Sequence, residues 1–366
     1  MLGGRPLGAV IEEKASGSRE AAGTVTVRVA VVGATGYVGR ELLSRLAKHP
    51  YTRVTRLMSS GRDGRKPYAI GQSHPVLRGK FTALCEPLAA ESLTPDETDV
   101  AFLATPHETA HELAPALLER GLRVIDLSAA FRLKNAEAYP RWYGFEHRAP
   151  QALEEAVYGL TELNGTAIRT ARLVANPGCY ATSVILGLAP LVRAGWLDPL
   201  APIISDSKSG ASGAGRAPSD KLHFVEVNEN CRAYALFSHR HVPEMLEALN
   251  LDASRFTFTP HLLPVTRGIL STIYVWLAEG RPLESVLELY RDFYAQAPLV
   301  RVLEDSLPEI QSVAWTNYTD IGFALDASRR QLIIVSALDN LGKGAAGQAI
   351  QSMNLMYGFP ETTALG

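Results

Sequence analysis

The sequence has few cysteines, no strong excess of either charge and no long apolar segment. Its three cysteines, Cys85, Cys179 and Cys231, are widely spaced and odd in number. This pattern argues against a disulfide framework and a Cys-rich zinc site, and it fits a reducing compartment. The net charge of -2 offers no basic footprint for nucleic acid or an anionic membrane, and no apolar run is long enough to span a bilayer. We expect a cytoplasmic protein with no bound metal and no nucleic-acid or membrane partner.

The composition is that of an ordinary globular protein. Hydrophobic residues make up 46% and charged residues 20% of 366 residues, a length that suggests roughly two domains. Residues 1–24 mix Gly, Ala, Glu and Arg without periodicity and lack the apolar region of a secretion signal. They are predicted to be a disordered N-terminal tail, or the product of an upstream start codon.

A strand, a glycine-rich turn and a helix follow this segment. Residues 25–32 are a β-branched run, and residues 40–48 carry leucines on one helical face. The turn between them has the spacing G-x-x-G-x-x-G, which in this context predicts a dinucleotide site with the pyrophosphate at the helix N-terminus. The residues predicted to bind the cofactor here are Gly33, Thr35, Gly36, Tyr37, Val38 and Gly39.

The second predicted strand, residues 53–58, favours NADP over NAD. It is followed by Ser59, Ser60 and Arg62, where NAD-binding proteins usually carry an acidic residue for the ribose hydroxyls. An Arg at this place can accept the 2′-phosphate of NADP. A solvated loop is the simpler alternative, and the neighbouring Asp63 weakens the case for NADP.

Alternating strands and helices continue to residue 127 and predict a doubly wound parallel sheet. Thr105 and Pro106 follow the strand at residues 100–104, at the edge where such sheets bind ligands. His107 is expected to start the next helix. Arg132 could clamp a phosphate or carboxylate bidentately, although a surface ion pair would explain it equally well.

Cys179 follows Pro177 and Gly178 and precedes an apolar run that predicts a helix. A thiol at a helix N-terminus meets unpaired N–H groups and the positive end of the macrodipole, which should favour the nucleophilic thiolate. The alternative is a small buried hydrophobic residue, the commoner role of a free Cys.

The C-terminal half is predicted to form an α+β domain with a mainly antiparallel sheet, reached through an irregular passage at residues 139–164. After a strand at residues 201–205, a Ser/Gly/Ala-rich loop carries Lys208 and Arg216 and is suited to anion capture, unless it is only a flexible linker. His239 and His241 offer a proton acceptor for Cys179, and at least one is expected to be structural. The last helix, residues 345–357, is expected to pack on the nucleotide domain.

Several motifs, in this order, resemble those of the N-acetyl-γ-glutamyl-phosphate reductase family of the semialdehyde dehydrogenase superfamily. The resemblance covers residues 25–358 and is carried by residues 33–39, 126–133, 176–180, 209–216, 239–244 and 340–348. It implies NADPH-dependent reduction of an acyl phosphate to an aldehyde, in a homodimer or homotetramer. It also implies a Rossmann-like NADP-binding domain of residues 25–175 and 340–366, and a catalytic and oligomerisation domain of residues 176–339.

The resemblance further implies the roles of individual residues. Cys179 matches the nucleophile, His241 the acid/base residue, and Asn340 a residue that orients the nicotinamide amide. A last group falls where the superfamily handles the substrate's phosphate or carboxylate: Arg132, Lys208, Ser209 and Arg216.

Two alternatives remain open. An aminoadipyl-phosphate reductase of carrier-protein lysine synthesis would share the chemistry, with an acyl chain one methylene longer that a pocket discriminates only weakly. A non-catalytic NADP-binding redox sensor would keep the glycine motif, but it would not need Cys179 at a helix start or the histidine motif.

Overall fold

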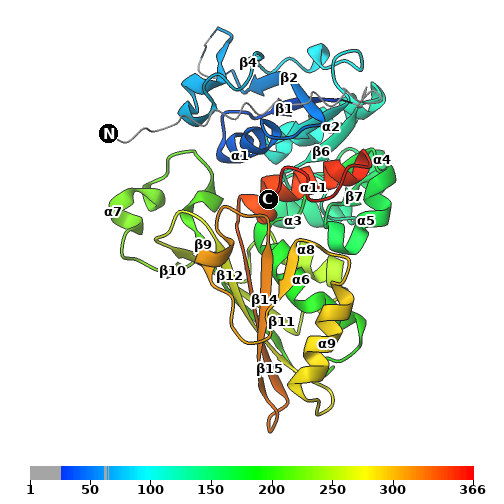
Figure 1. Cartoon of the computed structure of the whole chain (residues 1–366), viewed down its shortest axis with the longest axis vertical. Coiled ribbons are helices and arrows are strands. Elements are labelled where there is room, and N and C mark those ends of the chain that lie inside the picture. Colours follow the sequence, from blue (N-terminus) through cyan, green and yellow to red (C-terminus); the bar gives the residue numbers. More distant parts are fainter. Residues whose placement is uncertain (1–25, 62–63, 65) are drawn as a thin grey trace, which may run out of the picture.

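A computed structural model describes residues 26–61, 64 and 66–366, and it confirms the predicted fold class (Figure 1). These residues form two domains, each built on one sheet. The predicted tail at residues 1–24 and Arg62 lie outside the described residues.

The first sheet is parallel except for one edge pair. Its eight described strands have the order β3-β4-β2-β1-β5-β6-β8-β7, and only β3 and β4 run antiparallel to each other. Its central strands are apolar on both faces because helices cover both, as expected for a doubly wound sheet. The strands are β1 (Val27–Val32), β2 (Thr52–Ser59), β3 (Tyr68–Ala69), β4 (Leu84–Pro87), β5 (Val100–Leu103), β6 (Arg123–Asp126), β7 (Val157–Tyr158) and β8 (Leu173–Ala175).

The second sheet is mixed but mainly antiparallel. Its order is β10-β11-β9-β12-β15-β14-β13, with parallel pairs only between β11 and β9 and between β13 and β14. One face packs on α6 and α9, and the alternate side chains of β12 point to the other, half-exposed face. The strands are β9 (Ile203–Gly210), β10 (Arg232–Ala233), β11 (Phe256–Leu263), β12 (Ile269–Trp276), β13 (Val300–Val302), β14 (Thr319–Asp326) and β15 (Gln331–Leu338).

The helices divide between the two domains. Those of the first domain are α1 (Tyr37–Leu46), α2 (His107–Glu119), α3 (Tyr139–Tyr143), α4 (Pro150–Glu155), α5 (Thr161–Thr170) and α11 (Gly347–Met356). Those of the second are α6 (Cys179–Arg193), α7 (Phe224–Val227), α8 (Val242–Leu249), α9 (Leu283–Phe293) and α10 (Ile310–Val313).

The last helix returns to the first domain, as predicted. A π-helical turn, Gly342–Ala346, precedes α11, whose Ala349, Ile350 and Met353 join the apolar core around β1. The chain therefore crosses between the domains twice, and Figure 1 shows α11 between the upper and lower halves of the molecule.

Two sequence predictions about local structure are wrong. Residues 139–164 are not irregular, since they hold α3, α4, β7 and the start of α5 and belong to the first domain. These elements are too short to show a hydrophobic period. The strand predicted at residues 201–205 begins at Ile203 and continues to Gly210, because Ser205, Ser207 and Ser209 alternate into the interior like apolar residues.

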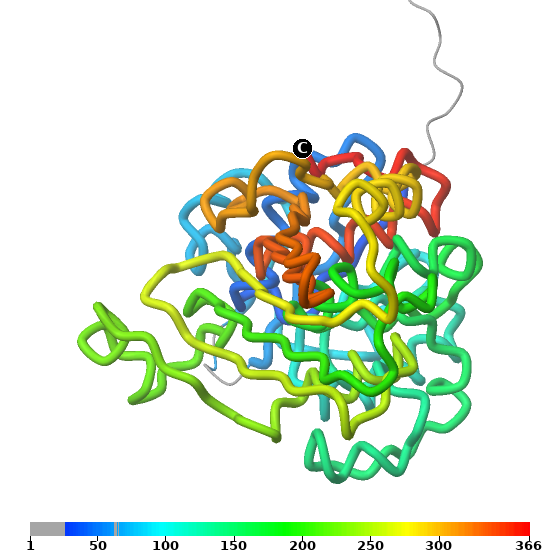
Figure 2. Tube along the Cα trace, turned by 90° about the horizontal axis from the view of Figure 1, so that it is seen from below, coloured from blue at the N-terminus to red at the C-terminus, as the bar shows by residue number. Residues whose placement is uncertain are grey.

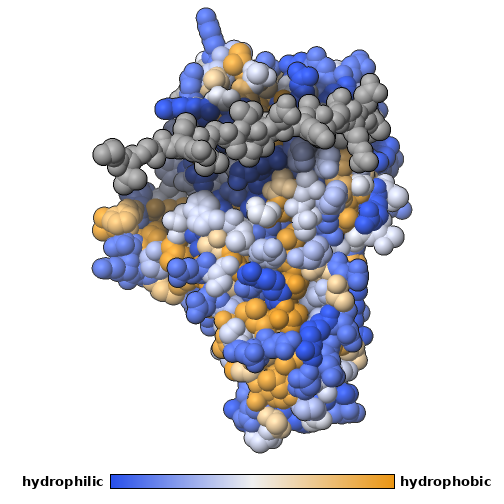
Figure 3. Space-filling model, viewed as in Figure 1, coloured by the Kyte–Doolittle hydropathy of each residue, from blue (hydrophilic) through white to orange (hydrophobic). Residues whose placement is uncertain are grey.

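Residues 217–238 form an arm that projects from the second domain, both in the ribbon view of Figure 1 and in the Cα trace of Figure 2. The arm exposes apolar side chains, with Phe224 and Phe237 among them, and Figure 3 shows apolar surface around α7 and over the lower domain. Among the described helices, none is both long and apolar enough to cross a membrane.

Candidate active site

Two cavities meet at the first turn of α6. The cleft, of about 480 Å³, lies between the start of α1, the carboxyl ends of β5, β6 and β8, and residues 212–216. The arm cavity, of about 600 Å³, lies between α6, the end of β9 and the arm. No Asp or Glu is among the described residues that line either cavity, so both are suited to anions. Five residues line both: Cys179, Gly213, Ala214, Arg240 and His241.

The glycines of the predicted dinucleotide turn are required by close packing and by access to the cleft. A Cβ on Gly33, whose φ is +88°, would lie 2.1 Å from the carbonyl oxygen of Ala104, and one on Gly39 would lie 2.4 Å from that of Gly33. Gly36 is less crowded and lines the cleft. The helix α1 then begins with no side-chain cap and no acidic residue in its first turn. Its free N–H groups therefore fit a pyrophosphate.

Four further predicted cofactor residues line the cleft. Thr105 carries a buried hydroxyl that has no hydrogen-bond partner among the described residues, so it can accept or donate a bond to a ligand. The four are Tyr37, Val38, Thr105 and Pro106.

Of the remaining predicted cofactor residues that the structure describes, Asn340 also lines the cleft, and the others lie outside its lining: Gly33, Thr35, Gly39, Ser59 and Ser60. Ser59 is buried at the end of β2, and Ser60 follows it on the surface. Thr35 lies in the turn and offers its carbonyl oxygen to Arg216 Nη1 at 2.7 Å. Asn340 does line the cleft, but its amide bonds Ser212 Oγ at 2.9 Å and the backbone N–H of Gly268 at 2.8 Å. These two bonds fix the loop after β9 against the start of β12. One N–H of the Asn340 amide remains available to a nicotinamide.

Cys179 begins α6, as predicted, after Gly178 as the N-cap residue. A feature that local sequence did not reveal is Glu244, a buried carboxylate from α8. Its Oε2 accepts the backbone N–H of Gly178 at 2.9 Å, and its Oε1 accepts from Arg132 at 3.0 Å. The protein thus supplies its own anion to the start of this helix.

The Cys179 thiol is half-buried, and its environment does not stabilise the thiolate in the free protein. Burial raises the pKa of Cys179 to about 11, although the positive charges of Arg132 and Arg240 and the backbone N–H of Tyr180 oppose the shift. The backbone N–H at the helix start favours the thiolate, as expected, but desolvation of the negative sulfur outweighs it.

The two histidines of the motif occupy different positions. His241 lies flat over Gly178, so a Cβ added there would be 2.5 Å from His241 Nε2, and its buried Nδ1 has no partner among the described residues. Burial holds the pKa of His241 well below its ordinary value, so the imidazole is neutral and can accept a proton. His239 lines only the arm cavity, and its Nδ1 accepts the backbone N–H of His241 at 3.1 Å. This geometry favours His241 as the base and gives His239 a structural role.

The four residues predicted to bind substrate are separated in space. Ser209 lines the arm cavity. Lys208 points to the opposite face of β9, where it pairs with Asp206 at 2.8 Å, because neighbouring strand residues face opposite ways. The single chain therefore does not bring Lys208 to Cys179. Arg132 reaches the cleft, but three of its N–H groups bond Asn176, Glu244 and Leu127, so it serves mainly to hold the start of α6.

The arm cavity contains cations that sequence reasoning missed. Arg240 lies between the two histidines, lines both cavities and has no hydrogen-bond or ion-pair partner among the described residues. Lys221 and Arg232 line the same cavity from the arm. The position of Arg240 inside the histidine motif was the one available signal.

Comparisons with known proteins agree with this arrangement. The family described as "Semialdehyde dehydrogenase, NAD binding domain" matches residues 28–171, and "Semialdehyde dehydrogenase, dimerisation domain" matches residues 179–340. N-acetyl-γ-glutamyl-phosphate reductase of Desulforapulum autotrophicum is 48% identical over 343 residues, covering 93% of this chain and 98% of the relative. The chain belongs to the N-acetyl-γ-glutamyl-phosphate reductase family. A second member, from Pelotomaculum thermopropionicum, is 46% identical over 345 residues with the same coverage.

Solved structures of other semialdehyde dehydrogenases share the fold. Aspartate semialdehyde dehydrogenase II from Vibrio cholerae matches with a TM-score of 0.68 at 21% identity, over 91% of this chain and 98% of that one. The enzyme from Candida albicans, solved with NADP, matches with a TM-score of 0.67 at 16% identity over the same shares. This N-acetyl-γ-glutamyl-phosphate reductase family member thus keeps the two-domain fold of the wider superfamily.

Proposed function

We propose that the chain reduces N-acetyl-γ-glutamyl phosphate to N-acetylglutamate semialdehyde with NADPH, releasing phosphate, in arginine biosynthesis. The observation that carries the proposal is that Cys179 and His241 line both cavities, so a nucleophile and a base lie where two anionic ligands would meet. The family's named members at 46–48% identity support the choice of substrate.

The cleft suits the cofactor. The uncapped start of α1 would hold the pyrophosphate, and the carboxyl ends of β5 and β6 would lie beside the nicotinamide half. When bound, NADPH supplies a hydride. Ser59 and Ser60, and with them Arg62 outside the described residues, are proposed to select the 2′-phosphate.

The arm cavity suits the acyl phosphate. Its cations Lys221, Arg232 and Arg240 can neutralise a carboxylate and a phosphate, and Tyr234 and Leu262 offer apolar surface to the remaining chain. Arg240, which has no partner among the described residues, is proposed to hold the departing phosphate.

The first chemical step is acyl transfer to Cys179. Sγ attacks the γ-acyl carbon, its proton passes to the neutral His241, and the bond to phosphate breaks, leaving a thioester on Cys179. Because the pKa of the thiol is about 11, the proton must leave as the new bond forms. The N–H of Gly178 is already bonded to Glu244, so the oxyanion is left to the N–H groups of the first turn of α6.

Reduction of the thioester then gives a thiohemiacetal on Cys179. His241, protonated in the first step, can protonate its oxyanion and later take the proton back as the aldehyde forms and the sulfur leaves. The proton then passes from His241 to the released Cys179 sulfur, a transfer that burial of both groups favours, and the neutral imidazole and the thiol are restored for the next turnover.

We further propose a cytoplasmic homodimer or homotetramer, assembled through the second domain. The support is the half-exposed face of its sheet, in which alternate side chains of β12 remain uncovered by helices, and the match of residues 179–340 to a dimerisation domain.

The reverse reaction tests the function. The wild type should reduce NADP with N-acetylglutamate semialdehyde only when phosphate is present, and Cys179→Ala should not. Activity with the aminoadipate analogue alone would keep the mechanism and change the pathway. NADPH binding without activity on either aldehyde would support a redox sensor and overturn the proposal.

A further inference from the structure

Arg216 crosses from the second domain to the first. It follows Gly215, whose φ of +86° reverses the chain after the short helix Ala211–Ala214, and its Nη1 donates to the carbonyl oxygen of Thr35 at 2.7 Å. Thr35 lies 181 residues earlier, inside the glycine-rich turn. A side chain of the catalytic domain therefore lies against the turn that would receive the cofactor's pyrophosphate.

Most of the guanidinium remains available to a ligand. Only one of its five N–H groups is bonded among the described residues, and no carboxylate pairs with it there. Arg216 lines the cleft together with Gly36 and Tyr37, the residues at which α1 begins. Its free donors therefore share a cavity with the uncapped N–H groups of that helix.

Arg216 brings positive charge to this turn. His74 lies beneath it, with Nε2 at 3.1 Å from the carbonyl oxygen of Ala34, and burial followed by the charges of Arg216 and Arg40 lowers its pKa. Arg216 lies at the positive end of the α1 dipole, and that helix has no acidic residue in its first turn. Such an arrangement is unfavourable until an anion occupies it.

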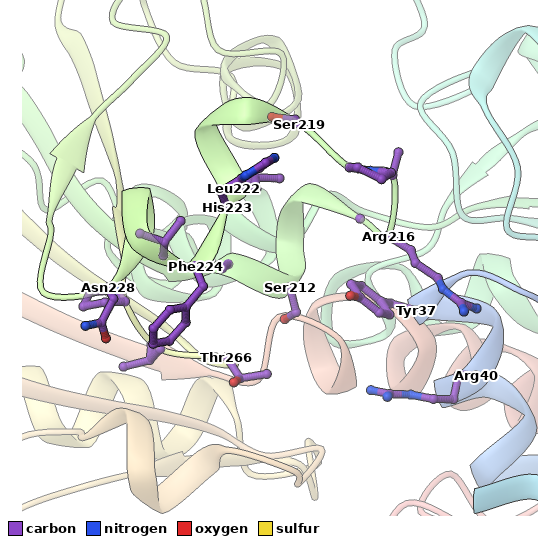
Figure 4. A pocket seen from close by; sticks show the side chains of 17 residues that line it. Tyr37, Arg40, Ser212, Arg216, Ser219, Leu222, His223, Phe224, Asn228 and Thr266 are labelled. Carbon is purple, nitrogen blue, oxygen red and sulfur yellow. The ribbon is translucent and has the colours of Figure 1, made fainter. Parts of the chain in front are cut away.

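The position of Arg216 argues against the substrate as that anion. Arg216 does not line the arm cavity, whereas Lys221, Arg232 and Arg240 do. A second groove, of about 610 Å³, lies next to the cleft and is also lined by Arg216 and Tyr37. Figure 4 shows these two side chains beside each other in this groove, together with Arg40, which lies on α1 like Tyr37. Arg40 lines that groove but not the cleft, which makes it a matched control.

We propose that Arg216 binds the pyrophosphate of the dinucleotide from across the domain boundary, opposite the N–H groups of α1. The inference rests on the proposed function, since it takes NADPH as the cofactor. It replaces the substrate role predicted for Arg216 from the sequence. The loop that carries Arg216 also places Gly213 and Ala214 in the wall of the arm cavity, so a bound cofactor would fix part of the acyl-phosphate site.

The test measures cofactor affinity without substrate. Dissociation constants of NADPH and NADH, from the fluorescence of the bound nicotinamide, are compared for the wild type, Arg216→Ala, Arg216→Lys and Arg40→Ala. Because both cofactors contain the pyrophosphate, Arg216→Ala should weaken both by a similar factor, about tenfold or more. Arg216→Lys should restore part of the loss, and Arg40→Ala should stay within about twofold. At saturating NADPH, the KM for the acyl phosphate should be nearly unchanged.

Three outcomes would overturn the inference while leaving the function intact. Unchanged affinity in Arg216→Ala would remove the contact, and a loss confined to NADPH would assign the residue to the 2′-phosphate. A raised KM for the acyl phosphate with normal cofactor affinity would return Arg216 to the substrate. If the wild type bound no NADPH, the proposed function itself would fail. Arg216 is exposed, so its variants should fold, which circular dichroism checks.

Discussion

Two helices, α1 and α6, start at the site, and the backbone N–H groups at their N-termini are used in opposite ways. Each begins after a glycine in extended conformation, Gly36 before α1 and Gly178 before α6, and neither residue carries a side-chain cap. At α1 the first N–H groups are left for a ligand. At α6 the N–H of Gly178 is bonded to Glu244, which is itself paired with Arg132. We propose the start of α1 as a binding site for an external anion, whereas at α6 the N–H of the N-cap residue Gly178 is already taken by an internal carboxylate.

This difference shows that a helix N-terminus does not by itself make a reactive cysteine. The carboxylate of Glu244 adds to burial in raising the pKa of Cys179, and Arg132 and Arg240 only partly compensate. The start of α6 therefore positions the sulfur of Cys179 beside His241, and it does not lower the pKa of the thiol enough to form the thiolate. In the proposed mechanism, His241 therefore takes the proton from Cys179 as the sulfur attacks.

Cys179→Ser, which changes the start of α6 alone, is expected to have the largest effect on activity. A hydroxyl ionises far less readily than a thiol and makes a poorer leaving group from the tetrahedral intermediate, so kcat should fall on the order of 10⁴-fold. The dissociation constant of NADPH, measured by fluorescence, should stay within about twofold. A joint loss of both would mean that the two helix starts are not independent.

A carboxylate at the start of α1 would make that helix resemble α6. Gly36→Asp is expected to fit, because a Cβ there has its nearest neighbour at 3.6 Å and the φ of -77° suits other residues. The new cap should raise the free energy of unfolding by about 0.5 kcal/mol. It should also repel the pyrophosphate and weaken NADPH binding about 100-fold. Thermal unfolding measures the expected gain in stability, and cofactor titration measures the expected loss of NADPH affinity.

Gly36→Ser supplies the control for that experiment. It caps the helix without a charge, so it should stabilise the fold similarly and weaken NADPH binding much less. Equal losses in the two variants would point to steric exclusion rather than charge.

The same comparison shows what sequence could predict. The β-branched run of β1, the glycine turn and the start of α6 at Cys179 are local signals, and each was predicted from neighbouring residues. The Glu244 contact to Gly178 joins residues 66 apart, and the Arg216 contact to Thr35 joins residues 181 apart. The face of β9 that carries Lys208 could not be read from the sequence, because the face on which a strand residue lies depends on the sheet's register. Contacts that only the fold creates decided the chemistry of the site.

Removing the internal anion of α6 should have an intermediate effect. Glu244→Gln leaves Arg132 buried without its partner, which should cost about 3 kcal/mol of stability. The loss of negative charge should lower the pKa of Cys179, since Glu244 raises it. Inactivation by iodoacetamide at pH 8 should therefore become faster, by up to about tenfold. The measurements are denaturant unfolding and the pH profile of alkylation.

Glu247→Gln is the matched control for Glu244→Gln, since Glu247 lies on the same helix and bonds the backbone N–H of Lys134 instead. It should leave the alkylation profile unchanged. Slower alkylation in Glu244→Gln would contradict the assigned sign and indicate that the carboxylate holds the sulfur in an accessible position.

The smallest effect is expected where a third element, the turn before α11, contacts Cys179. Gly344, in the π-helical turn before α11, leaves no room for a side chain, because a Cβ there would lie 2.8 Å from Cys179 Cβ. Gly344→Ala should push Cys179 away from His241 by a few tenths of an ångström and lower kcat by about tenfold, since small misplacements of reacting groups are costly. Gly36→Ala, at the roomier helix start, should leave kcat within about twofold. Steady-state kinetics of both variants would show whether α6 demands tighter placement than α1. An equal loss of kcat in the two variants would mean that the position of Cys179 is no more sensitive to added volume than the cofactor turn.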